Sequence, residues 1–300
     1  MVAHSTKPRF GTLLTAMVTP FTDEGAVDLD AAQNLAAHLV DGGNDGLVVT
    51  GTTGETPTLT DDENVAMFKA VMEAVGDRAA VIAGTGTNDT AHSINLSRRA
   101  QEVGVDGILL VTPYYNKPSQ AGVRAHIEAI ADATDVPVML YDIPGRTGIP
   151  METDTIVALS QHERIIALKD AKGNLLETTK VIARTDLDVY SGDDGMTLPL
   201  IAIGGKGVVS VTAHVAAPQY RALVDAALAG DFETARRLHF ELDPLQRALM
   251  THIQGAIAAK QVLHWQSVLP NSVVRLPLVQ PTAEELNPVK ADLAEAGWEI

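Results

Sequence analysis

One lysine lies at the end of an apolar run, where its amine could act as a nucleophile toward a substrate. Lys169 directly follows the apolar run Ile165–Leu168. A lysine amine has a pKa of about 10.4 in water. Burial and a nearby cation lower that pKa, so that the neutral amine can attack a carbonyl. Arg146 is a candidate for this cation. The alternative is a lysine that reaches toward solvent or pairs with Asp170, and position alone leaves both interpretations open.

Polar residues that end other apolar runs could join the same site. Tyr141 closes one run, and its hydroxyl could donate or accept a proton. Thr52 and Thr53 lie between Gly51 and Gly54, which let backbone N–H groups approach an anion such as a carboxylate or a phosphate. Taken singly, the tyrosine also fits a rim aromatic bonded to backbone, and the threonines fit an ordinary tight turn.

The residue types that usually bind metals form no recognisable site. The sequence contains no cysteine, which excludes disulfides, thiolate catalysis and cysteine-bound zinc or iron–sulfur clusters. Asp193 and Asp194 are adjacent carboxylates without a patterned histidine or third acid, so helix capping is favoured over metal binding. We therefore predict no metal site.

Eight short apolar runs separate these polar residues. The runs are continuous rather than alternating, which is typical of parallel strands buried on both faces. They are Leu13–Val18, Gly46–Val49, Ala80–Gly84, Gly107–Val111, Val136–Tyr141, Ile165–Leu168, Asp188–Gly192 and Gly207–Val211.

Segments with helical periodicity lie between the runs. Val65, Phe68 and Met72 recur at spacings of three and four, and Thr60 with Glu63 forms a predicted helix cap. Eight strand–helix units allow a closed (β/α)8 TIM barrel or a doubly wound open sheet. The count of eight and the even spacing favour the barrel, and the glycine fingerprint of dinucleotide binding is absent.

A barrel would bring the polar residues together, because its active site forms at the carboxyl ends of the strands. We expect a loose tail over residues 1–10 and a catalytic barrel over residues 11–230. From residue 231 to residue 300 the pattern is helical only, which predicts a C-terminal helical extension.

Charge and composition exclude several classes of partner. The net charge of −16 disfavours binding to nucleic acid or to an anionic membrane surface. No apolar run approaches the roughly 20 residues needed to span a bilayer. The first residues show no apolar signal core. With the lack of cysteine, these features predict a soluble, cytoplasmic protein.

In combination, the motifs resemble the N-acetylneuraminate lyase superfamily of class I aldolases. Within it they look like the dihydrodipicolinate synthase family. The similarity extends from Gly11 to about residue 230, and the segment Arg275–Leu278 beyond it is also similar. The motifs, in the expected order, are GTTGE, TPYYNKPSQ, YDIPGRTG, KDAKGN, SGDD and GVVSV.

The resemblance implies how a Schiff base would form and how protons would move. Lys169 would condense with pyruvate, and Tyr141 would relay protons to and from the adduct. Thr52 would link Tyr141 to Tyr115. In this family the second tyrosine of the pair reaches the neighbouring subunit's site, so the resemblance implies at least a dimer, and we expect a homotetramer built as a dimer of dimers.

The resemblance also implies how the two substrates would bind. Thr53, Val209 and Gly192 would surround the pyruvate. Arg146 would bind the carboxylate of the second substrate, aspartate semialdehyde. The protonated imine would be the electron sink, so no cofactor is expected.

Feedback by lysine is expected to be weak or absent. Two residues match the allosteric cleft of regulated members, Asn88 and Tyr114. Five other positions of that cleft depart from the histidine- and glutamate-containing pattern: Thr56, Pro57, Asp61, Asn64 and His92.

Two other functions compete with the synthase. One is a pyruvate-dependent aldolase or lyase that acts on a sugar acid, and the other is a barrel that binds a keto acid without turnover. Arg146 favours the synthase, because a guanidinium binds a carboxylate bidentately. The joint presence of Lys169, Tyr141, Thr52 and Tyr115 argues against a non-catalytic barrel.

Overall fold

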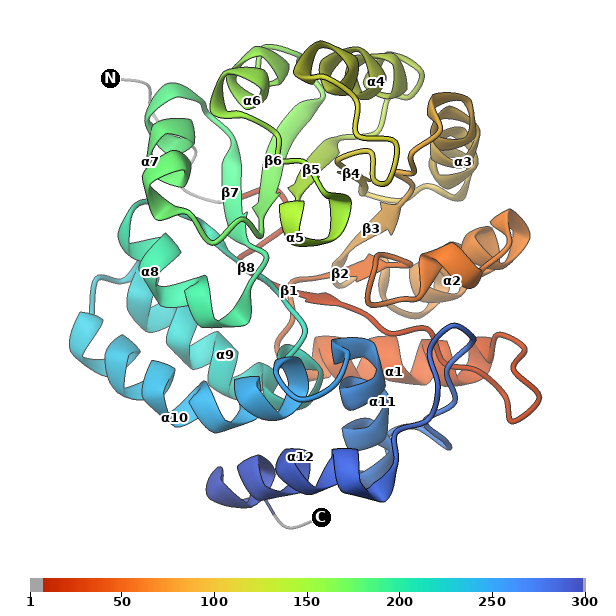
Figure 1. Ribbon diagram of the computed structural model, residues 1–300, viewed down its shortest axis with the longest axis vertical. Coiled ribbons are helices and arrows are strands. Elements are labelled where there is room, and N and C mark those ends of the chain that lie inside the picture. Colours follow the sequence, from red (N-terminus) through yellow and green to blue (C-terminus); the bar gives the residue numbers. More distant parts are fainter. Residues whose placement is uncertain (1–7, 299–300) are drawn as a thin grey trace.

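Eight parallel strands form a closed barrel in the computed structural model, which describes residues 8–298. The strands are β1 (Leu13–Ala16), β2 (Gly46–Val49), β3 (Ala80–Gly84), β4 (Gly107–Val111), β5 (Val138–Asp142), β6 (Ile165–Asp170), β7 (Asp188–Ser191) and β8 (Gly207–Ser210). Each strand pairs with its neighbour in sequence, and β1 also pairs with β8, where Leu14 is opposite Val209. The predicted (β/α)8 barrel is therefore confirmed (Figure 1).

Helices surround the barrel on its outside (Figure 1). They are α1 (Leu29–Asp41), α2 (Asp61–Val75), α3 (Thr90–Val103), α4 (Gln120–Asp132), α6 (Thr153–Leu159), α7 (Leu175–Arg184), α8 (Thr197–Ala202) and α9 (Ala213–Leu228). The short helix α5 (Pro144–Thr147) directly follows β5. Two short 3-10 turns, η1 (Thr56–Thr58) and η2 (Asp194–Met196), follow β2 and β7. The predicted cap of α2 is present, since the Thr60 hydroxyl accepts from the Glu63 amide and the Glu63 carboxylate accepts from the Thr60 amide.

Two apolar layers explain why the strand sequences are apolar without alternation. Leu14 and Val48 point inward and help to fill the barrel. Their neighbours Leu13, Leu47 and Val49 belong to the layer between strands and helices. Because successive residues of a strand point to opposite faces, burial on both sides demands apolar residues at every position.

An aromatic side chain fills the amino-terminal end of the barrel. Phe10 is 1% exposed and belongs to the inner apolar layer. Its ring lies against Gly107, the first residue of β4. Phe10 falls in the segment predicted as a tail, of which residues 1–7 lie outside the described residues. The carboxyl ends of the strands, at the opposite end of the barrel, are where the site is expected.

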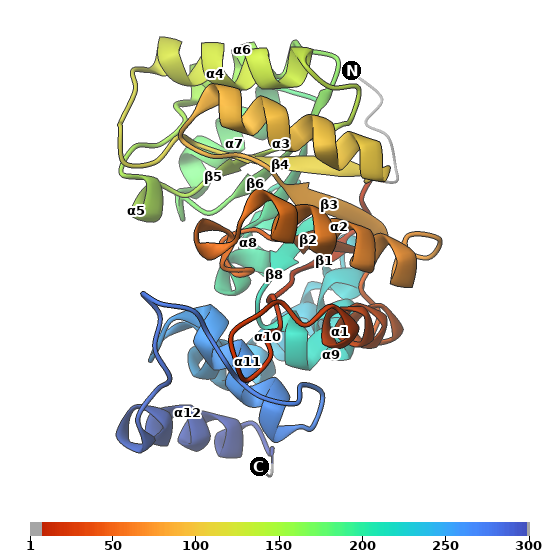
Figure 2. The same ribbon diagram turned by 90° about the vertical axis from the view of Figure 1, so that its right-hand side faces the viewer.

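The C-terminal extension consists of α10 (Phe232–Met250), α11 (Gly255–Trp265) and α12 (Ala283–Glu295). Figure 2 shows these helices together on one side of the barrel, and α10 packs on both α9 and α12. The irregular connection between α11 and α12 returns to the barrel, where Arg275 contacts Glu63 of α2. Within residues 8–298, no helix has the length and apolarity to cross a membrane.

Candidate active site

The two central residues of the candidate site lie on neighbouring strands. Tyr141 of β5 is in register with Lys169 of β6. Both side chains are buried, at 5% and 4% exposure. The Nζ atom of Lys169 lies 4.4 Å from the centre of the Tyr141 ring. The amine therefore lies at the carboxyl end of the barrel, over the ring of a tyrosine whose hydroxyl could exchange protons with a bound substrate.

The surroundings of Lys169 suit a nucleophilic amine. The pKa of Lys169 is lowered to about 8: burial has the largest effect, the Arg146 guanidinium also lowers it, and the Asp194 carboxylate opposes both. Asp170 is not the partner of Lys169, because its carboxylate accepts from the Thr178 hydroxyl at 2.7 Å on the outer face of the strand. The sequence left both interpretations open, and the structure supports a buried amine with a lowered pKa, as imine formation requires.

Asp194 has a larger part in the site than its sequence context suggested. Its neighbour Asp193 does cap η2, accepting from the Gly195 amide at 3.0 Å. Asp194, however, is buried and accepts from the Ser210 hydroxyl and from the backbone N–H groups of Val211 and Thr212. Burial raises the pKa of Asp194, and these three donors oppose that rise. Because a backbone N–H can only donate, the donors favour the carboxylate, which places a negative charge near Lys169.

A hydrogen bond joins Tyr141 to the turn after β2. Burial raises the pKa of Tyr141 to about 12, whereas Arg146 and a hydrogen bond with the Thr52 side chain lower it. The tyrosine is therefore protonated near neutral pH. A tight turn holds Thr52 and Thr53: a Cβ added to Gly54 would lie 2.8 Å from the Cα atom of Thr50. Glycine at this position is thus required for the close approach of the two backbone segments.

Gly192 and Val209 shape the space around the lysine. A Cβ added to Gly192 would lie 3.0 Å from both Cγ and Cε of Lys169 and 2.9 Å from Cβ of Ala171. Gly192 therefore leaves room for the lysine stem. Val209 is 1% exposed and belongs with Tyr141 to the inner apolar layer. Both predicted residues thus lie in the neighbourhood of Lys169 or Tyr141.

A cavity of ≈ 590 Å³ opens at this end of the barrel. Thr52, Tyr141, Arg146 and Tyr115 all contribute to its lining, so four predicted site residues meet there. Tyr115 is 89% exposed and has a φ of 72°, in the left-handed region that non-glycine residues seldom adopt. Thr53 is not among the lining residues and lies half-buried in the turn.

A second buried acid lies behind the Tyr141–Lys169 pair. Asp142 of β5 is fully buried, and the Lys172 amine lies 3.3 Å from its Oδ2 atom. Burial raises the pKa of Asp142 to about 6, although Lys172 lowers it. The sequence offered no signal for this acid, since a polar residue at a strand end does not reveal which face it occupies.

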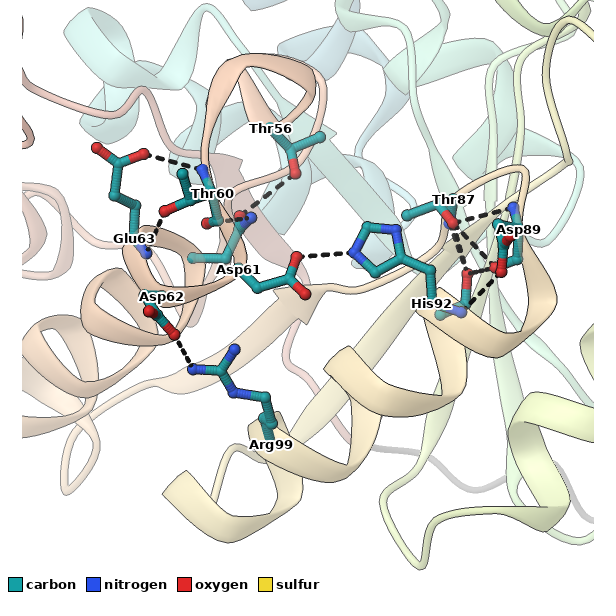
Figure 3. Close-up of polar contacts among 11 residues, drawn as sticks. Thr56, Thr60, Asp61, Asp62, Glu63, Thr87, Asp89, His92 and Arg99 are labelled. Atoms are coloured by element: carbon teal, nitrogen blue, oxygen red, sulfur yellow. Dashed lines mark hydrogen bonds and ion pairs between the residues drawn. The ribbon is translucent and has the colours of Figure 1, made fainter.

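The positions compared with the allosteric cleft form polar contacts among themselves. The Nε2 atom of His92 and the Oδ1 atom of Asp61 are hydrogen-bonded at 2.7 Å between the first turns of α2 and α3 (Figure 3). Thr56 donates to the Asn64 side chain at 3.3 Å. Within residues 8–298, no cluster of three or more histidine, cysteine, aspartate or glutamate residues could hold a metal ion.

Comparison with known proteins identifies the family. The profile described as the Dihydrodipicolinate synthetase family matches residues 9–296. The chain belongs to this family. The 4-hydroxy-tetrahydrodipicolinate synthase of Kineococcus radiotolerans is 56% identical over 288 residues, which cover 96% of this chain and 94% of that protein. A second such synthase, from Streptomyces coelicolor, is 55% identical and covers 97% of each chain.

Solved structures agree with this assignment. A dihydrodipicolinate synthase from Bacillus anthracis has a TM-score of 0.92 and 45% identity, covering 95% of this chain and 98% of its own. The names of these family members confirm the predicted synthase class and do not support a sugar-acid lyase or a non-catalytic barrel. The predicted family, fold and enzyme class are thus confirmed, whereas the role of each site residue stays a prediction.

Proposed function

We propose that this family member joins pyruvate to aspartate 4-semialdehyde through a Schiff base on Lys169. The observation that carries the proposal is the buried Lys169 amine, whose pKa falls to about 8, beside the Tyr141 ring at 4.4 Å. The product would be 4-hydroxy-tetrahydrodipicolinate, the compound named in the relatives' enzyme name. The absence of cysteine from the sequence fits the reducing cytoplasm that we propose as the enzyme's location.

Imine formation would begin the reaction. The neutral Lys169 amine attacks the keto carbon of pyruvate, and water leaves as the C=N bond forms. Tyr141, protonated because burial raises its pKa to about 12, can supply the proton that the leaving oxygen needs. Thr53 and the backbone of its glycine-flanked turn would bind the pyruvate carboxylate, while Gly192 and Val209 would enclose the rest of the molecule.

Carbon–carbon bond formation would follow. The iminium ion loses a methyl proton to the Tyr141 oxygen and becomes an enamine. The enamine carbon attacks the aldehyde of the second substrate, and the aldehyde oxygen takes up a proton to become a hydroxyl. The substrate's own amine then attacks the imine carbon, closes the ring and releases Lys169. The iminium nitrogen accepts the electron pair of the broken C–H bond, and the enamine then donates that pair to the aldehyde carbon, so this chemistry needs no cofactor.

Arg146 would select the second substrate. It lines the cavity and its charge acts on both Lys169 and Tyr141. A planar guanidinium binds a carboxylate through two parallel hydrogen bonds, which fits the carboxylate of aspartate semialdehyde.

Tyr115 would complete the proton path from a second subunit. Its ring is 89% exposed on a backbone with a positive φ, although it is a large aromatic residue. Such exposure is expected for a side chain that inserts into a neighbouring protomer, where it would meet Thr52. We therefore propose at least a dimer, assembled further into a homotetramer as a dimer of dimers.

Borohydride reduction in the presence of pyruvate tests the proposal. Reduction fixes an imine as a stable secondary amine, and mass spectrometry of peptides should locate a pyruvyl adduct on Lys169. Lys169→Met, which keeps the stem and lacks the amine, should show none. Absence of an adduct in the unaltered enzyme would refute the Schiff base. Turnover of aspartate semialdehyde, compared with a panel of sugar aldehydes, would decide the second substrate.

A further inference from the structure

A buried ion pair connects the Thr52–Thr53 turn to the C-terminal extension. Glu55 is 3% exposed, and Lys260 of α11 is 1% exposed. The Lys260 amine donates to Oε1 of Glu55 at 2.5 Å and to the carbonyl of Val273 at 2.8 Å. The other carboxylate oxygen of Glu55 accepts from the backbone N–H of Arg275 at 3.0 Å. The carboxylate and the amine therefore bind partners on two parts of the extension.

The backbone at Glu55 needs such support. Glu55 has a φ of 56° in the left-handed region, a strained conformation that a non-glycine residue keeps only where its surroundings hold it. Its N–H donates to the Thr52 carbonyl at 3.1 Å, so the same residue closes the turn. Thr52 precedes Glu55 in the sequence and Thr56 follows it, and both line the cavity, whereas Glu55 itself does not. A side chain anchored behind the turn can thus decide where the turn presents its hydroxyl and amide groups.

The surroundings of the ion pair leave little freedom. The Lys260 amine lies 4.1 Å from the centre of the Phe21 ring, and the Arg275 guanidinium lies 4.6 Å from the same ring. Arg275 also makes two contacts with the Glu63 carboxylate. Desolvating two charges offsets much of their attraction, so a buried pair adds little net stability, but removing one partner strands the other charge. The pair is thus better suited to specifying one geometry than to stabilising the fold.

We propose that Glu55 and Lys260 are positioning residues that hold the Thr52–Thr53 turn in the geometry that binds the keto acid. The C-terminal extension would thereby be part of the catalytic unit, although it lies beside the barrel. This inference rests on the proposed function of the turn, because a turn that bound no substrate would not need positioning.

Two single variants test the proposal. Glu55→Gln keeps the shape of the side chain and removes its charge, and Lys260→Met keeps most of the stem and removes the amine. Each should raise the KM for pyruvate by about 10-fold or more, while the KM for aspartate semialdehyde changes by less than about 2-fold. A pyruvyl adduct should still be trapped on Lys169 at saturating pyruvate. If Lys260→Met does not fold, Glu55→Gln decides the question.

A double variant and a matched control separate positioning from stability. If the two side chains act as one unit, the double variant should raise the KM for pyruvate no more than the worse single variant does. Asp292→Asn removes a carboxylate that is 6% exposed and pairs with Arg247 and His252 elsewhere in the extension. It should lower the melting temperature and leave the KM for pyruvate unchanged.

The outcomes are distinguishable. Equal KM values for pyruvate in the two single variants and the unaltered enzyme would overturn the positioning role. If Asp292→Asn raised the KM for pyruvate as much as the two single variants do, the effect would be due to general destabilisation. That result would also overturn the positioning role. Failure of the proposed function would appear differently, as the absence of a pyruvyl adduct from the unaltered enzyme.

Discussion

Schiff-base formation on Lys169 should titrate with a midpoint near pH 8, and Asp194→Asn should move that midpoint to lower pH. Burial lowers the pKa of Lys169 to about 8, and Asp194 raises it. Removing the Asp194 charge therefore removes a stabilising partner of the protonated amine. Asparagine has the same shape and can still accept from the backbone N–H groups of Val211 and Thr212, so the local structure should be retained.

The magnitude follows from the difference between the two pKa values. The change from 10.5 to about 8 corresponds to about 3 kcal/mol in favour of the neutral amine. At pH 7, about 9% of an amine with a pKa of about 8 is neutral, compared with about 0.03% of one with a pKa of 10.5. Burial and the nearby charges thus increase the reactive fraction of Lys169 by about 300-fold.

The assay is the initial rate of borohydride trapping with pyruvate, measured from about pH 6 to about pH 10. Peptide mass spectrometry would quantify the adduct on Lys169. Asp193→Asn provides a matched control, because this exposed neighbour caps η2 and an asparagine can cap it equally well. The control should keep the midpoint of the unaltered enzyme, whereas Asp194→Asn should lower it.

Two results would refute this reasoning. A trapping rate that is flat through pH 8 and rises only near the pKa of a free lysine would show that the folded protein does not lower the pKa of Lys169. A midpoint that Asp194→Asn leaves unmoved, or raises, would show that the Asp194 charge does not act on the amine.

Three further predictions follow from the site. Gly192→Ala should lower kcat/KM by about 100-fold, because the new Cβ would crowd Cβ of Ala171 and displace the Lys169 stem, and steady-state kinetics measure this. Asp142 has a raised pKa of about 6, so the stability that its protonated form contributes is present below about pH 4 and is lost as the pH rises through about 6. Asp142→Asn should therefore gain up to about 3 kcal/mol in unfolding free energy at about pH 7 and almost nothing near pH 4, as urea titrations can show. Millimolar lysine should inhibit the enzyme weakly or not at all. Asp61 and His92, which contact each other, depart from the residues of regulated family members (Figure 3). An activity titration with lysine checks this.

Each of these predictions can fail visibly. Full activity in Gly192→Ala would mean that Lys169 still reaches the substrate when its side chain is displaced. Parallel pH–stability curves for Asp142→Asn and the unaltered protein would show that folding does not raise the pKa of Asp142. Strong inhibition by lysine would show that the altered cleft still binds the amino acid.

The sequence alone determined the architecture. Continuous apolar runs at regular intervals specify strands buried on both faces, and eight of them in series favour closure. In a parallel barrel, strands that are consecutive in sequence lie side by side. The residues at the ends of β5 and β6 are therefore neighbours, and the family resemblance of the motifs assigned Tyr141 and Lys169 to one site.

Side-chain pairing between distant elements was decided only by the tertiary structure. The sequence allowed Lys169 to pair with its neighbour Asp170, but strand alternation sends the two side chains to opposite faces. Asp194 was expected to cap a helix, yet it is buried and accepts hydrogen bonds from Ser210, at the end of β8, and from Val211 after it. Glu55 and Lys260 are 205 residues apart in sequence, and no local pattern predicts their contact.

The physical reason lies in the range of the interactions involved. Hydrophobic periodicity and helix caps depend on neighbours within a few residues, so the sequence displays them directly. The charge state and orientation of a buried side chain depend on desolvation and on partners brought together by packing. The sequence therefore determined which residues reach the carboxyl end of the barrel, and the tertiary structure decided which of them are buried, charged and held in place.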